Sequence, residues 1–244
     1  MKKLLFVYAV MMAAVSVCAQ PITIIPRIGA TSSTISTQYD EDIKAKTGFT
    51  LGVGVNYLVN QTFSVQAELN FIQKGYLEES SSSRSDFLDN FEQTPYTTTE
   101  TSKGKQTLNY FEIPVLAKVI FGNKTKFFLN AGPSIGIGLG GKYTSESKST
   151  IVYSYSDGDE TESYSSDIKG NIKFGTMPDG ADENDWYIDN RIDFGLQFGG
   201  GALIADRIMI EARYGLGLSN LYNSDYEVKN RVFQVTVGIP IRLY

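Results

Sequence analysis

Residues 107–121 read TLNYFEIPVLAKVIF, and this stretch decides the fold. Every second residue from Phe111 to Phe121 is apolar, whereas the residues between them include Glu112 and Lys118. Alternation of this kind is typical of a β-strand with one apolar face and one mixed face. The stretch is also longer than the roughly five or six residues of a usual strand in a soluble protein.

The same two-residue period recurs along the chain, and nothing after the first twenty residues shows the period of a helix. We therefore predict eight strands, at residues 22–32, 48–59, 62–76, 107–121, 126–143, 190–204, 207–220 and 231–243. A bulge near Pro240 would bring the final Tyr244 into phase with the apolar face of the last strand.

Short and long connections alternate between these strands. Tight turns are predicted at residues 60–61, 122–125 and 205–206, and long loops at 33–47, 77–106, 144–189 and 221–230. Tyrosine alternates with polar residues at 153–156, so an alternative is that the strands on both sides of loop 144–189 continue as a hairpin with its turn near residues 156–159. All tight turns then lie at one end of the sheet, together with both termini. This layout predicts an all-β fold, an eight-stranded antiparallel transmembrane β-barrel with short periplasmic turns, long extracellular loops and a periplasmic N-terminus.

A soluble β-sandwich is the alternative, because its strands also alternate, with the apolar face turned inward. Three features favour the barrel. The strands are long, their polar faces carry many glycines as a crowded interior requires, and the strict asymmetry of the connections has no reason to occur in a sandwich.

Composition excludes several kinds of chemistry. The 244 residues contain no histidine and one cysteine, so a Ser-His-Asp site, a Cys-His site and a Cys/His zinc site are all absent. A net charge of −5 argues against nucleic acid as a partner. We expect no enzyme activity, no cofactor and no metal.

The first nineteen residues have the pattern of a secretory signal peptide. Lys2 and Lys3 precede an apolar run that is too short to span a bilayer, and small residues follow at Cys18 and Ala19. We expect residues 1–19 to be the signal peptide and residues 20–244 to be the barrel domain. An uncleaved anchor and lipidation of Cys18 are the alternatives.

Several short motifs add a family resemblance. They are Gln73-Lys74-Gly75-Tyr76, Leu108-Asn109-Tyr110-Phe111-Glu112-Ile113-Pro114-Val115-Leu116, Asn130-Ala131-Gly132-Pro133, Asp193-Phe194-Gly195, Glu211-Ala212-Arg213-Tyr214 with Gly217-Leu218, and Lys229-Asn230-Arg231-Val232-Phe233. In this order they resemble the PorT-like family of small outer-membrane β-barrel proteins. The resemblance implies an eight-stranded barrel in the cell outer membrane of a Gram-negative bacterium. It implies no defined biochemical activity.

Assigning the apolar faces to lipid turns a set of charged residues inward. An eight-stranded barrel is only just wide enough for side chains to fill, so these charges must pair with one another. We expect a charge network that plugs the interior, with inward glycines making room for it. Its members would be Arg27, Glu68, Lys74, Glu112, Lys118, Asp193, Glu211, Arg213 and Arg242.

Aromatic residues mark the expected membrane boundaries. Tyr57, Phe63, Phe121 and Phe127 flank the tight turns and would form the periplasmic girdle, whereas Trp186 and Tyr187 would anchor the chain at the outer boundary. The acidic residues just before Trp186 are a weak calcium candidate, since their spacing does not follow a known calcium loop.

The function expected from these features is structural or interaction-based. The extracellular loops or an envelope protein would provide the contacts, and other partners would be outer-membrane lipid, lipopolysaccharide and the assembly machinery. The alternatives are a narrow channel for a small solute or ion, an accessory role in protein export, and an acid-only lipid enzyme that uses Glu112 or Glu211.

Overall fold

The computed structural model describes residues 22–38, 42–88, 94–224 and 226–243. The expected signal peptide, and Tyr244 with its phase, therefore lie outside the described residues. No helix in the described part of the chain is long and apolar enough to cross a membrane. Its eleven strands are β1 (Ile22–Ser36), β2 (Ile43–Leu58), β3 (Phe63–Phe87), β4 (Pro95–Phe121), β5 (Thr125–Tyr155), β6 (Gly158–Phe174), β7 (Trp186–Ile188), β8 (Ile192–Ile204), β9 (Ile208–Gly217), β10 (Lys229–Gly238) and β11 (Ile241–Leu243).

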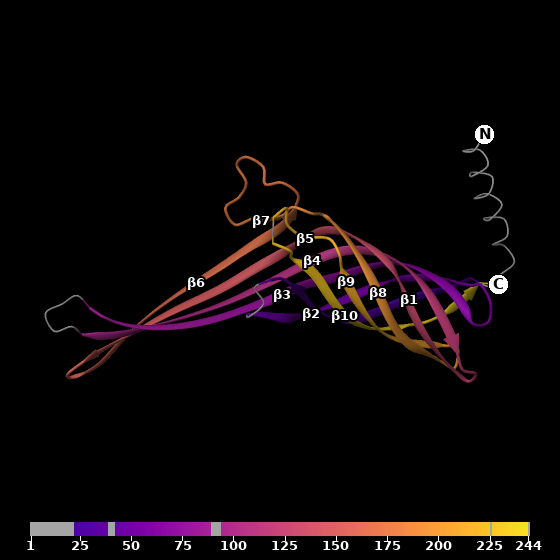
Figure 1. Cartoon of the computed structure of the whole chain (residues 1–244), viewed down its shortest axis with the longest axis horizontal. Coiled ribbons are helices and arrows are strands. Elements are labelled where there is room, and N and C mark those ends of the chain that lie inside the picture. Colours follow the sequence, from indigo (N-terminus) through magenta and orange to yellow (C-terminus); the bar gives the residue numbers. More distant parts are fainter. Residues whose placement is uncertain (1–21, 39–41, 89–93, 225, 244) are drawn as a thin grey trace.

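Eight of these strands form a closed ring (Figure 1). Their hydrogen-bonded order is β4-β3-β2-β1-β10-β9-β8-β5, and β5 pairs back onto β4 to close it. All eight pairings are antiparallel. Closure leaves no free edge around the ring, so its backbone groups are satisfied from within.

Side chains alternate between the two faces of the ring, as the two-residue period predicts. On β4, Phe111 and Val115 are 44% exposed, whereas Glu112 and Lys118 are 4% exposed. The outward face is thus apolar and the inward face is polar. An apolar band of this kind on the outside of a closed sheet is the surface that a bilayer covers.

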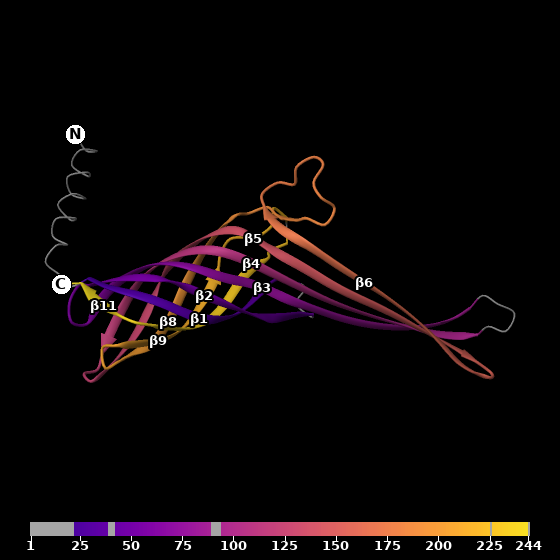
Figure 2. The same cartoon turned by 180° about the vertical axis from the view of Figure 1, so that it is seen from behind.

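The two longest expected loops are contradicted by the structure, because both are largely strand. Residues 77–87 and 95–106 form the ends of β3 and β4, and residues 144–189 contain the end of β5, all of β6 and β7. These strands extend well past the ring as one tapering sheet (Figures 1 and 2). The turn predicted near residues 156–159 is present, but it joins β5 to β6 rather than β5 to β8.

A single rung marks where this extension begins. Glu79 pairs with Lys103, Lys103 with Glu146, and Glu146 with Asp167. We call the part beyond this rung the protruding sheet: residues 79–87 of β3, 95–103 of β4, 146–155 of β5 and 158–167 of β6. It has no apolar stripe, so its stability comes from the backbone ladder and from cross-strand hydroxyl pairs such as Ser85–Thr97 at 2.9 Å.

The chain ends without the expected bulge. β10 stops at Gly238 and β11 begins at Ile241, yet Gly238 faces Arg27 and Ile241 faces Ile24, so both pieces share one register with β1. Pro240 interrupts the strand because it has no N–H to donate, and no residue is inserted there.

Candidate functional site

Four charged side chains form a closed ring in the middle of the interior. Arg27 on β1 and Arg213 on β9 each contact both Glu68 on β3 and Glu211 on β9. The distance is 2.8 Å for Arg27–Glu211, 2.8 Å for Arg213–Glu68 and 2.7 Å for Arg213–Glu211. All four residues are buried, so each carboxylate is shared by two guanidinium groups and is not exposed to water.

Amide and hydroxyl side chains form further hydrogen bonds with these four charged side chains. Asn70 donates to Glu68 at 2.8 Å, and Thr236 accepts from Arg27 at 2.6 Å. A buried ion pair is favourable only when its remaining hydrogen-bonding groups are also satisfied. The other supporting residues are Gln66, Asn130 and Gln197.

A second polar layer lies next to the first. Lys74 on β3 pairs with Glu112 at 2.8 Å and with Asp193 at 3.0 Å. Gln197 joins the two layers, because its oxygen accepts from Arg213 at 3.0 Å and its nitrogen donates to Glu112 at 2.7 Å. The open space in this layer is about 10 Å³, which is at the lower limit for a single water molecule.

An apolar cluster closes the interior on the side of the long connections. Gly138 lies against the Phe174 ring, and a Cβ there would approach the ring to 2.5 Å, so this position admits only glycine without rearrangement. The Phe174 ring in turn packs edge-on against Tyr110. The buried members are Ile35, Ile72, Leu108, Tyr110, Ile172, Phe174, Ile188, Leu221 and Val232.

Two of the nine predicted network residues behave differently from the rest. Lys118 is buried, but its Nζ donates to Gln66 at 2.5 Å and does not reach a carboxylate among the described residues. Arg242 does not join the network, and the prediction that it does is wrong. It lies on β11 at the end of the ring, its side chain is 48% exposed, and it contacts Asp206 at 3.3 Å.

The predicted aromatic residues also divide into two groups. Phe63, Phe121 and Phe127 are exposed on the outward face at the tight turns, and Phe121 stacks on Phe127. Tyr57 pairs with the outward Val65.

Trp186 is 47% exposed, and its ring packs on Tyr143 at 4.5 Å. It pairs with Ile172 of β6, and its role as an anchor at the outer membrane boundary stays a prediction. Tyr187 pairs with Lys173, on the opposite face of β7.

The acidic segment before Trp186 does not gather its carboxylates. No group of three or more potential ligands that could hold a metal occurs among the residues that the structure describes. Asp185 contacts Lys173 at 2.5 Å, and the hydrogen bond from that ammonium lowers the pKa of the Asp185 carboxyl. Asp182 accepts from the backbone of Asn184.

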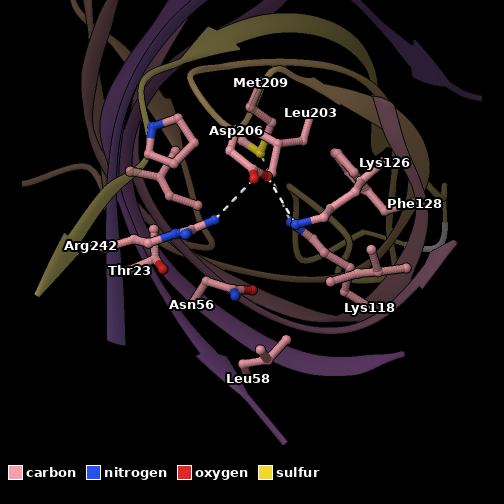
Figure 3. A pocket seen from close by; sticks show the side chains of 13 residues that line it. Thr23, Asn56, Leu58, Lys118, Lys126, Phe128, Leu203, Asp206, Met209 and Arg242 are labelled. Carbon is pink, nitrogen blue, oxygen red and sulfur yellow. Dashed lines mark hydrogen bonds and ion pairs between the residues drawn. The ribbon is translucent and has the colours of Figure 1, made fainter. Parts of the chain in front are cut away.

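A cluster at the tight-turn end of the ring was not predicted. Asp206 lies between Lys126, at 2.9 Å, and Arg242, at the mouth of a cavity of about 430 Å³ (Figure 3). Both Ala205 and Asp206 have positive φ, of 50° and 56°, as the central residues of a type I′ turn do, and the N–H of Arg207 donates to the carbonyl of Ile204 at 3.0 Å. The Ala-Asp sequence gave no hint of this turn geometry, which favours glycine or asparagine.

A closed ring with an outward apolar belt and a salt-bridged interior defines an all-β barrel of the outer-membrane class. The sequence matches the family described as outer membrane protein beta-barrel domain over residues 18–223, and the chain belongs to that family. The family indicates the outer membrane of a Gram-negative bacterium.

Three solved structures are similar to this chain at low sequence identity. Ail, the attachment invasion locus protein of Yersinia pestis, is 13% identical, with a TM-score of 0.40 and coverage of 91% of this chain and 99% of that one. Neisserial surface protein A is 11% identical, with a TM-score of 0.34 and coverage of 90% and 97%. OprG from Pseudomonas aeruginosa is 8% identical, with a TM-score of 0.32 and coverage of 91% and 96%. No curated protein matches the sequence.

Proposed function

We propose that the chain is a non-enzymatic barrel of the PorT-like kind that makes contacts at the cell surface through its protruding sheet. Its tight turns and N-terminus would face the periplasm, and the protruding sheet would point away from the cell. The observation that carries this proposal is the contrast between a filled interior and a long sheet that packs against nothing in the described part of the chain.

The filled interior favours a structural role over transport. The Arg27–Glu68–Arg213–Glu211 ring, the Lys74 layer and the apolar cluster follow one another along the interior, and the Lys74 layer leaves space of about 10 Å³. A solute or ion would have to separate these buried pairs, which costs several kcal/mol for each charge that loses its partner, on the order of 3–5.

The outer edge of the protruding sheet is open to a further strand. Before Ile172, no described strand pairs with the outer side of β6, so this edge presents unpaired N–H and C=O groups. Asp159, Glu160, Glu162 and Asp167 lie along it. Like charges on an edge discourage pairing with a second copy and select a partner of opposite charge.

The net charge of the whole protruding sheet is also negative. Its four segments hold eight acidic residues against three basic ones, a net charge of −5. We therefore propose that its partner is a basic, extended protein segment that adds to the β6 edge as a strand. The outward face of the ring would contact lipid and, at its outer boundary, lipopolysaccharide, and the assembly machinery would act on the last strands.

The test is site-specific photo-crosslinking in intact cells. A photoreactive residue at Thr161, exposed on β6, is expected to give discrete protein adducts, whereas the same residue at the outward Phe198 is expected to give none. The adducts should weaken as salt is raised, because opposite charges are screened. Equal labelling from both positions, or no protein adduct from β6, contradicts the proposal.

A trimmed variant separates the sheet from the barrel. Residues 80–102 and 147–166 are each replaced by Asn-Gly, which cuts all four strands at the same rung. This variant lacks Thr161 and therefore tests the barrel alone, which should keep the heat-modifiable migration of a folded barrel. Planar-bilayer recordings of the full chain should show no sustained current, and a steady open channel would contradict the plugged interior.

A further inference from the structure

The cavity at the tight-turn end has an apolar wall. It is bounded by the ends of β1, β2, β4, β5, β8 and β9 and by residues after β10, and its volume is about 430 Å³. Ile25, Phe128 and Met209 pack together there, with Ile120 and Leu203 against them. Sites for small molecules are typically of this size, mostly apolar, with a few polar groups that fix orientation.

One buried cation, Lys118, borders this cavity. Lys118 is 4% exposed, and its Nζ lies 4.1 Å from the centre of the Phe128 ring and 3.9 Å from the sulfur of Met209. Its hydrogen bond to Gln66 uses one of three N–H donors. The other contacts are weak acceptors, and no carboxylate of the described residues pairs with it. A charge buried in this way gains from an anion that supplies the missing partner.

The mouth of the cavity is also positive. Lys126 and Arg242 share a single carboxylate, that of Asp206 (Figure 3). With Lys118, the charged residues that line the cavity are three cations and one anion, which gives a net charge of +2. A concave site of one sign attracts ligands of the opposite sign.

The lining also contains a buried polar atom without a hydrogen-bond partner among the described residues, the Oδ1 atom of Asn56. The Asn56 amide points into the same space as the Lys118 side chain (Figure 3). Buried polar atoms are nearly always paired in proteins, so this oxygen favours a donor, such as a water molecule, beside it.

We propose that this cavity binds a small carboxylate with an apolar body, such as a medium-chain fatty acid. The carboxylate accepts hydrogen bonds from Lys118, and the apolar body lies against Ile25, Phe128 and Leu203. Lys126 and Arg242 draw the anion to the mouth. The positive charge of Lys118 makes the cavity bind an anion in preference to an alcohol or an ammonium of the same chain length.

The test uses octanoate as the probe and the methyl groups of methionine as reporters. Residues 20–244 contain only Met177 and Met209, and Met177 lies exposed outside the ring. The chain is purified from outer membranes into nanodiscs of zwitterionic lipid and followed by carbon-13 methyl NMR. Octanoate should shift the Met209 signal saturably and leave the Met177 signal in place. Octanol and octylammonium should give no saturable shift.

Two variants identify the site. Lys118→Met keeps the length of the side chain and should weaken octanoate binding at least tenfold, whereas Arg84→Met on the protruding sheet should have no effect. Leu203→Trp fills the cavity, leaves Lys118 in place and should abolish the octanoate-induced shift of the Met209 signal. It is the alternative test if Lys118→Met does not fold. The proposal is overturned if octanol and octanoate shift Met209 alike, if Met209 does not respond, or if a folded Lys118→Met variant binds octanoate as before.

Discussion

Replacing Arg213 with methionine tests the energetics of the interior most directly. The Arg213 side chain has no exposure to solvent and donates to Glu68 at 2.8 and 3.0 Å, to Glu211 at 2.7 and 3.2 Å, and to Gln197 at 3.0 Å. Methionine preserves the stem and removes the charge. Glu68 and Glu211 then share Arg27 alone, so two buried carboxylates are left with one guanidinium.

Loss of one partner from a buried ion pair costs about 3–5 kcal/mol, and here two carboxylates are affected at once. We therefore expect the free energy of unfolding of Arg213→Met to fall by at least about 3 kcal/mol. The assay is urea unfolding in phosphatidylcholine vesicles, followed by far-ultraviolet circular dichroism and by the heat-modifiable gel band.

A double variant gives the matched control for this prediction. Arg213→Met combined with Glu68→Gln removes one cation and one anion, and leaves Arg27 and Glu211 as a single pair. It should be more stable than Arg213→Met alone. A loss below about 1 kcal/mol in the single variant, the value of an exposed ion pair, would refute the reasoning. So would a double variant that is no more stable than the single one.

Three further predictions concern the ends of the molecule. Hydrogen exchange should be fastest in the protruding sheet and slowest in the ring, because only the ring buries its ladder under packed side chains; uniform protection would contradict this. Ala205→Gly should stabilise the chain by up to about 1 kcal/mol in the same urea assay, since alanine is strained at positive φ, whereas Ile204→Gly should destabilise it. The lowered pKa of Asp185 means that its contact with Lys173 is present above the ordinary aspartate pKa of about 3.9 and is lost as pH falls through the lower, folded value. Trp186, the single tryptophan, should report this loss as a fluorescence change that Asp185→Asn abolishes; a transition near neutral pH would contradict the assignment.

The ring and its buried charges follow from alternation in the sequence. Once Phe111 is placed outward, Glu112 must point inward, and the same parity places Glu68, Asp193 and Arg213 inside. The alternation determines which face of the sheet a residue lies on, but not its position along the axis of the ring. Arg242 shares the inward phase, yet β11 sets it at the very end of the ring beside Asp206, where it is half exposed.

The protruding sheet was missed for a different reason. Residues such as Ser80 to Ser83 have polar neighbours on both faces, so no apolar stripe shows a two-residue period there. The backbone ladder that holds these strands needs no particular side chain, and sequence patterning does not record it. The parallel pairing of β7 with β6 was also not predicted, because no alternation in the sequence indicates it.

The buried cations outnumber the buried carboxylates. Arg27, Arg213 and Lys74 contact all four buried carboxylates of the described residues, whereas Lys46 and Lys118 contact none of them. Lys118 lies on the side of the cavity. Glu68 and Glu211 belong to the next layer and are already paired, so they offset the Lys118 charge only at a distance. The cavity end of the interior is therefore positive. The two ends of the molecule therefore carry charges of opposite sign. The protruding sheet is acidic and suits a basic segment, whereas the cavity at the tight turns is basic and suits a small anion.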